Sequence, residues 1–252
     1  MVKIGLALMV FLITVQGFGQ DLETDRPDQT ESSNTVPKGT LQIESGLGIQ
    51  IAQNGLTGLN DRSFVLPTSL FRIALANKFE LRVVNTLRCN RSENIFFNTV
   101  GNWEIDDLQL GFKWKWVEGD GAKPQISLMS HAVLPTGSVN VGNMCGIVNK
   151  LLLSHDFSNG WGLGYNFGYD YLGIGDGNLT YSISFAMPIT DKLGTYIESY
   201  GVYENIENFV TNADAGITYL WKDNIQLDYS FGIGITNRMN YHALGLSIRL
   251  PK

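Results

Sequence analysis

Eleven charged residues occupy positions of this 252-residue sequence whose neighbours of the same parity are mostly small or polar. Both signs are present in the set, so strong selectivity for one ion sign is not expected. Such side chains can line a polar passage for solutes, or they can pair with one another and stiffen a filled interior. Both interpretations are open from the sequence. The residues are Glu44, Arg72, Glu80, Arg82, Arg88, Lys113, Lys115, Asp170, Asp214, Asp228 and Arg249.

A second cluster of charges, Asp25, Arg26 and Asp28, lies in a polar segment over residues 20–39. This segment contains two prolines and no apolar period, which indicates an extended or irregular leader. The leader is either a solvated tail, as polar termini often are, or a plug in which Arg26 meets carboxylates of the polar face. The sequence leaves both alternatives open.

The positions of the histidines do not indicate a catalytic site. His131 and His155 follow Ser130 and Ser154, but adjacent residues of a strand point to opposite faces, so neither pair can act as base and nucleophile. No glycine-rich loop leads into a helix. We therefore expect no enzyme, no catalytic residue, no cofactor and no metal site.

The composition is unlike that of an ordinary soluble protein. Charged residues make up 17%, whereas glycine (28 residues) and aromatic residues (11%) are abundant; soluble proteins contain roughly 25% charged residues. The net charge of -6 argues against a nucleic-acid partner. Cys89 and Cys145 are too few for a disulfide scaffold and lack metal-site spacing, so we expect free thiols.

The polar face belongs to strands, because apolar and polar residues alternate with a period of two. The run WGLGYNFGYDY over residues 161–171 places aromatic side chains on one face and Gly, Asn and Asp on the other. About twelve segments of roughly 10 to 13 residues follow this pattern. They are 41–52, 64–75, 79–89, 104–117, 124–134, 145–157, 161–171, 178–187, 193–203, 211–221, 224–235 and 241–250.

These strands predict an all-β fold, a closed antiparallel transmembrane β-barrel. Strands of sandwich proteins usually run about 5–6 residues, whereas a tilted membrane strand needs about 9–11. An even number of strands closes such a barrel, and the connections alternate between longer and shorter, as outer-membrane barrels do. The apolar face then contacts lipid, with interfacial aromatic residues at strand ends. These are Trp103, Trp116, Trp161, Tyr171, Tyr219, Trp221 and Tyr241.

The N-terminus predicts export. Lys3 precedes an apolar stretch over residues 4–15, and Gly17 and Gly19 are small residues at the cleavage positions, so residues 1–19 read as a cleaved signal peptide. Residues 20–39 form the leader and residues 40–252 the barrel. We expect the outer membrane of a Gram-negative bacterium, with insertion by the barrel-assembly machinery.

Several stretches resemble a known family. They are 23–33 (ETDRPDQTESS), 35–39 (TVPKG), 41–46 (LQIESG), 134–137 (LPTG), 214–220 (DAGITYL) and 226–230 (QLDYS). They are similar to the outer-membrane transporters named for the meta-cleavage pathway of phenol degradation, in their Bacteroidetes-type branch. The resemblance spans nearly the whole mature chain, and the leader motif is its most specific part. It implies an outer-membrane barrel with a transport role.

Two functions of different classes follow. The first is a channel or transporter that passes small solutes, including amphipathic or aromatic ones, across the outer membrane. The second is a closed structural or adhesion barrel whose outer loops, notably residues 90–103, bind an external partner. The sequence specifies neither the solute nor the oligomeric state.

Overall fold

The computed structural model describes residues 22–53, 58–92, 101–138, 144–173 and 175–250. The predicted signal peptide and residues 93–100 of the predicted binding loop lie outside these ranges. Among the described residues, no helix is long and apolar enough to cross a membrane. The described strands are β1 (Leu41–Gln53), β2 (Asn60–Ala76), β3 (Phe79–Ser92), β4 (Trp103–Ile105), β5 (Leu108–Val117), β6 (Gln125–Leu134), β7 (Gly146–Asp156), β8 (Gly162–Tyr171), β9 (Asn178–Pro188), β10 (Leu193–Glu204), β11 (Asn208–Lys222), β12 (Ile225–Gly234) and β13 (Met239–Leu250).

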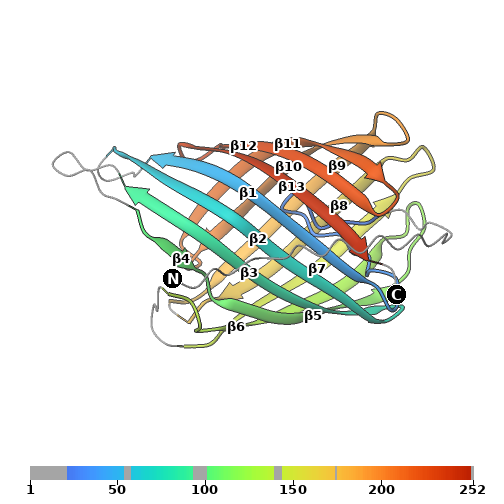
Figure 1. The fold of residues 1–252 in the computed structure, drawn as a ribbon, viewed down its shortest axis with the longest axis horizontal. Coiled ribbons are helices and arrows are strands. Elements are labelled where there is room, and N and C mark those ends of the chain that lie inside the picture. Colours follow the sequence, from blue (N-terminus) through green and yellow to red (C-terminus); the bar gives the residue numbers. More distant parts are fainter. Residues whose placement is uncertain (1–21, 54–57, 93–100, 139–143, 174, 251–252) are drawn as a thin grey trace, which may run out of the picture.

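The strands form one antiparallel sheet that closes on itself (Figure 1). Each strand from β6 to β12 pairs with its two neighbours in sequence, β5 pairs with β6 and β3, and β1 joins the last strand to the second. Leu41 pairs with Leu250, so β1 begins and β13 ends at the same end of the barrel. Within the described residues, closure pairs the strands of the barrel on both sides, which is the condition for placing strands in hydrocarbon. The predicted closed antiparallel barrel is confirmed.

The segment predicted as one strand over residues 104–117 is divided into β4 and β5, which both pair with β3. The break falls at Asp106 and Asp107. Asp106 donates its backbone N–H to the carbonyl of Thr86, and its carboxylate pairs with Arg88 at 2.6 Å. These contacts replace the regular ladder at this point, and β4 with β5 fills the place of one barrel strand. The described chain thus has a 12-stranded barrel with one additional short strand.

The second strand is also longer than predicted, beginning at Asn60 rather than at residue 64. Pro67 explains the weak sequence signal. Proline cannot donate to the ladder, and the pairing of β2 with β3 shifts between Val65 and Thr68. The irregularity therefore concentrates at the proline, and the ladder continues on both sides of it.

The distribution of side chains is the reverse of that in a soluble protein. Large apolar residues are exposed on the outside, with Phe167 and Ile197 each 56% exposed, whereas Gln42 and Arg72 are fully buried. An apolar exterior around a polar interior is the signature of a membrane barrel. Four tryptophans predicted at the interfaces are exposed, Trp103, Trp116, Trp161 and Trp221.

Two features of the interior differ from the alternation pattern. Tyr241, predicted at the membrane interface, donates its hydroxyl to the buried Asp214 and therefore lies inside. The interior wall formed by β6 and β7 is partly apolar rather than uniformly small and polar. Its buried apolar cluster consists of Met129, Val133, Val148 and Leu152.

Candidate functional site

Residues 22–38 of the predicted leader lie inside the ring of strands (Figure 1), and from here on the leader means these residues. Their hydrogen bonds reach strands on opposite sides of the barrel. Thr30 donates to Ser182 of β9, Arg26 donates to Asp228 of β12, and the leader carboxylate of Asp25 accepts from Arg82 of β3. A segment in contact with the sheet on all sides occupies the lumen.

Carboxylate groups of the strands accept hydrogen bonds from backbone N–H groups of the leader. The N–H of Asp25 donates to Glu44 at 2.9 Å, that of Gln29 to Glu198 at 2.7 Å, and that of Val36 to Glu80 at 2.8 Å. Buried backbone N–H groups must find partners, and the leader has no strand ladder to provide them. The inward carboxylates therefore fix the path of the leader through the barrel.

The central contact is a buried carboxylate among three cations, called the carboxylate cradle below. The Asp25 carboxylate is 2.6 Å from Arg82, 2.9 Å from Lys113 and 3.4 Å from Arg72. Burial raises the pKa of Asp25, but Arg72, Lys113 and Arg82 outweigh burial and hold that pKa well below its usual value. Asp25 is therefore ionised at neutral pH.

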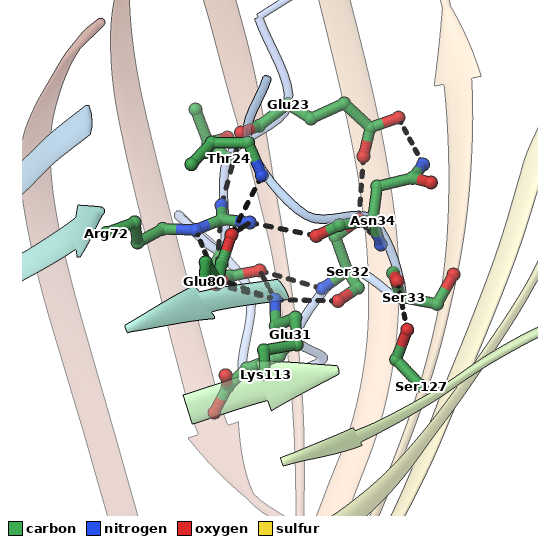
Figure 2. Close-up of polar contacts among 12 residues, drawn as sticks. Glu23, Thr24, Glu31, Ser32, Ser33, Asn34, Arg72, Glu80, Lys113 and Ser127 are labelled. Atoms are coloured by element: carbon green, nitrogen blue, oxygen red, sulfur yellow. Dashed lines mark hydrogen bonds and ion pairs between the residues drawn. The ribbon is translucent and has the colours of Figure 1, made fainter. Parts of the chain in front are cut away.

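The cations of the cradle also hold the leader through its carbonyl groups (Figure 2). Arg72 donates to the backbone oxygens of Glu23 and Asn34 at 3.2 and 2.9 Å, and Lys113 donates to that of Ser32 at 2.8 Å. Within the wall, Arg72 pairs with Glu80 at 2.9 Å and with Glu44 at 3.0 Å. The guanidinium group of Arg72 thus joins the two strand carboxylates to the leader.

A second leader carboxylate extends the network. Glu31 pairs with Arg82 at 2.7 Å and with Lys150 of β7 at 3.0 Å. Burial raises the pKa of Glu31, but Lys150 and Arg82 outweigh it and lower that pKa to about 2. The cations of this side, called the basic wall, are Arg72, Arg82, Lys113 and Lys150.

The opposite side of the lumen, called the acidic wall, consists of Glu198 on β10, Asp214 on β11 and Asp228 on β12. Arg26 of the leader pairs with Asp228 at 3.0 Å. The leader thus presents carboxylates to the basic wall and its arginine to the acidic wall. Asp28 lies on the acidic side, where burial, with a contribution from the Asp214 carboxylate, raises its pKa to about 7.

Two glycines make room for Arg26. Gly46 and Gly245 are directly opposite each other on β1 and β13. A Cβ atom at Gly46 would lie 2.5 Å from the guanidinium of Arg26, and one at Gly245 would lie 2.3 Å from it. Side chains cannot approach that closely, so both positions require glycine as long as Arg26 is docked.

Not every charged residue identified in the sequence joins this network. Glu44, Arg72, Arg82 and Lys113 contact Asp25, and Glu80 pairs with Arg72 and Arg82, whereas Arg88 pairs with Asp106. The remaining ones have separate surroundings. Lys115 donates to Asn34 at 2.6 Å, Arg249 lines a cleft beside leader residues 34–38, Asp170 is half-buried, Asp214 accepts from Tyr241 and Asp228 pairs with Arg26.

Sequence reasoning missed three charged members of the site, Glu31, Lys150 and Glu198. Lys150 precedes three consecutive leucines, which hides the alternation, although Leu152 shares its parity and is fully buried. Glu198 shares its parity with Tyr196 and Tyr200, so the alternation does not show which face of its strand is the polar one. Glu31 belongs to the leader motif, where no periodicity identifies a partner.

The hydrogen bonds of His131 and His155 go to residues other than the neighbouring serines. His131 hydrogen bonds with Arg82 and Gln109, and His155 with Tyr165 and the carbonyl of Gly121. Both cysteines are free, Cys89 buried and Cys145 exposed. Within the described ranges, no three His, Cys, Asp or Glu residues are grouped so that they could hold a metal ion.

Solved structures share this fold at low sequence identity. An outer membrane channel from Pseudomonas putida F1 is 12% identical, with a TM-score of 0.72 over 86% of this chain and 98% of that one. The KdgM porin in complex with disordered oligogalacturonate is 9% identical, with a TM-score of 0.54 over 82% and 98%. The NanC porin is 10% identical, with a TM-score of 0.54 over 82% and 100%.

Among curated proteins, none matches the chain. A family description, "Putative MetA-pathway of phenol degradation", matches residues 24–250. The match begins within the leader and ends at the last residue of β13, so it covers both the barrel and the segment inside it. The chain belongs to this MetA-pathway phenol-degradation family.

Proposed function

We propose that this protein is an outer-membrane channel for small molecules and that its leader closes the lumen. The observation that carries the proposal is the kind of contact that holds the leader. Within the described chain, every hydrogen bond between residues 22–36 and the strands involves at least one side chain. The closed ladder of the barrel does not depend on these contacts, so the leader can leave while the barrel stays folded.

The family and the fold together favour transport over catalysis. The neighbours of similar fold are a channel and porins, and the family is described by a phenol pathway, which points to amphipathic or aromatic solutes. The exposed apolar side chains face lipid, and the barrel-assembly machinery inserts the chain into the outer membrane.

The test is planar-bilayer conductance of the full chain and of a variant lacking residues 22–38. We expect the full chain to be mostly closed and the variant to show discrete openings, because removing the leader vacates the lumen. A difference in gel migration between unboiled and boiled samples shows that each barrel is folded. A folded variant that stays silent supports the closed structural or adhesion barrel instead.

A further inference from the structure

We propose that Arg72, Arg82 and Lys113 form a binding site for the carboxylate of a small solute with an apolar body, and that Asp25 is the internal occupant of this site. The inference rests on the proposed function, because a solute must enter the lumen to reach the cradle, and it binds there once the Asp25 carboxylate no longer occupies the three cations. It adds a solute class and a position in the lumen to that function.

The cradle contacts both oxygens of a planar carboxylate. Lys113 donates to Oδ1 at 2.9 Å and to Oδ2 at 3.0 Å, and Arg82 donates to Oδ2 at 2.6 Å. Arg72 approaches Oδ2 at 3.4 Å. Charge-assisted contacts to both oxygens of one group give the geometric specificity typical of carboxylate recognition.

The pairing of the strands indicates that an anion is required here. Arg72 of β2 is directly opposite Arg82 of β3. Like charges at directly opposite positions of neighbouring strands destabilise a sheet, yet these two residues are 0% and 2% exposed. Glu80 pairs with both of them, and the Asp25 carboxylate is the second anion between them.

The charge balance shows what the leader contributes. The ion pairs on this side of the lumen take four cations from the strands, the basic wall defined above, and two strand carboxylates, Glu44 and Glu80. The leader supplies two more carboxylates, Asp25 and Glu31. When the leader leaves, the basic wall has an excess of positive charge at the cradle, and an incoming carboxylate restores the balance.

An apolar surface adjoins the cradle. Met129 of β6 is directly opposite Lys113 of β5, and it packs with the fully buried Leu152 of β7. Ser33 of the leader hydrogen bonds to Ser127 and Ser154, which flank this cluster on the two strands (Figure 2 shows Ser33 facing Ser127). Departure of the leader therefore uncovers apolar side chains next to three cations, which suits a carboxylate with a compact apolar body.

The first experiment uses the full chain with Asp25→Ala, purified in detergent and titrated with benzoate by calorimetry at constant ionic strength. We expect one benzoate per chain, weaker binding of acetate and no saturable binding of chloride or inorganic phosphate. Wild-type protein, whose cradle is occupied, should bind benzoate at least about tenfold more weakly. Asp28→Ala removes a leader carboxylate outside the cradle and should behave like wild type.

The second experiment assigns the site to the cradle with a matched pair of variants on β5. In the Asp25→Ala background, Lys113→Gln should weaken benzoate binding about tenfold or more, because a charge-assisted contact is lost. Lys115→Gln removes the cation two residues along the same strand, which contacts Asn34 and not Asp25, and should leave binding unchanged. Met129→Gln should weaken the binding of benzoate more than that of acetate.

The outcomes separate this inference from the proposed function. A folded Asp25→Ala protein that binds no benzoate, or binds it equally well with Lys113→Gln, overturns the carboxylate site. If Asp25→Ala does not fold, the variant lacking residues 22–38 is titrated in its place with the same expectations. Benzoate binding by a barrel that never conducts overturns the channel and leaves the site standing.

Discussion

The position of Arg26 depends on two glycines, which leave space for its guanidinium group, and on its ion pair with Asp228. Its guanidinium group lies against Gly46 and Gly245 and pairs with Asp228. We expect Gly245→Ala to displace Arg26 and to increase the open probability of the channel, because an arginine side chain can move away whereas the strand backbone cannot. The check is bilayer conductance together with gel migration, which should still report a folded barrel.

Gly162→Ala is the control for this prediction. A Cβ atom there meets Ala186 at 3.7 Å and the carbonyl of His155 at 3.9 Å, which are ordinary contacts. Its conductance should match that of wild type. Equal conductance of the Gly245 and Gly162 variants contradicts a role of Arg26 in holding the leader.

The sequence predicts which side chains share the polar face, but it does not predict how they pair. Alternation alone groups Glu44, Arg82 and Lys113, because each follows the period of its own strand. The pairing of Asp25 with Lys113 joins positions 88 apart, and it depends on the register around the barrel and on the path of an irregular segment. Neither leaves a periodic signal, so the cradle emerges only when the strands are assembled.

Each strand has a lipid-facing side, where a charged residue is destabilising, and a lumen-facing side, where charged residues are found. Phe167 is 56% exposed on β8, while its neighbour Asn166 is 3% exposed. We expect Phe167→Arg to destabilise the barrel by about 2–4 kcal/mol, the cost of an arginine on the lipid face near the midplane. Urea unfolding in lipid vesicles measures this, and Phe167→Leu is the apolar control that should change stability little. Equal stability of the two variants contradicts the lipid-facing assignment.

The strand pattern can be predicted well because one face of each strand contacts lipid and the other face lines the polar interior, so apolar and polar residues must alternate. Residues 178–187 and 193–203 were expected as strands, and β9 (Asn178–Pro188) and β10 (Leu193–Glu204) each extend only one residue further. The pattern fails where side-chain bonds override alternation, as at Asp106 and Asp107 between β4 and β5. It also fails on β6 and β7, because the buried Met129 and Leu152 lie on the face that elsewhere is polar.

The whole molecule places opposite charges on opposite walls of one lumen, and the leader forms ion pairs with both walls. Removing residues 22–38 leaves a basic wall on β2, β3, β5 and β7 facing an acidic wall on β10, β11 and β12. Fixed charges that line a pore set its ion selectivity, and opposing walls act against each other. The leader-deleted channel should therefore show weak selectivity between cations and anions in a potassium chloride gradient.

Neutralising one wall at a time should reveal the other. In the leader-deleted channel, Glu198→Gln combined with Asp228→Asn should shift the reversal potential toward anion selectivity, because Asp214 is then the one carboxylate of the acidic wall that opposes the basic wall. Lys150→Gln in the same background should shift it toward cation selectivity. We expect the two shifts to have opposite signs because both walls face one shared passage. Shifts of the same sign, or no shift in either variant, contradict a single conducting lumen bounded by the basic wall and the acidic wall.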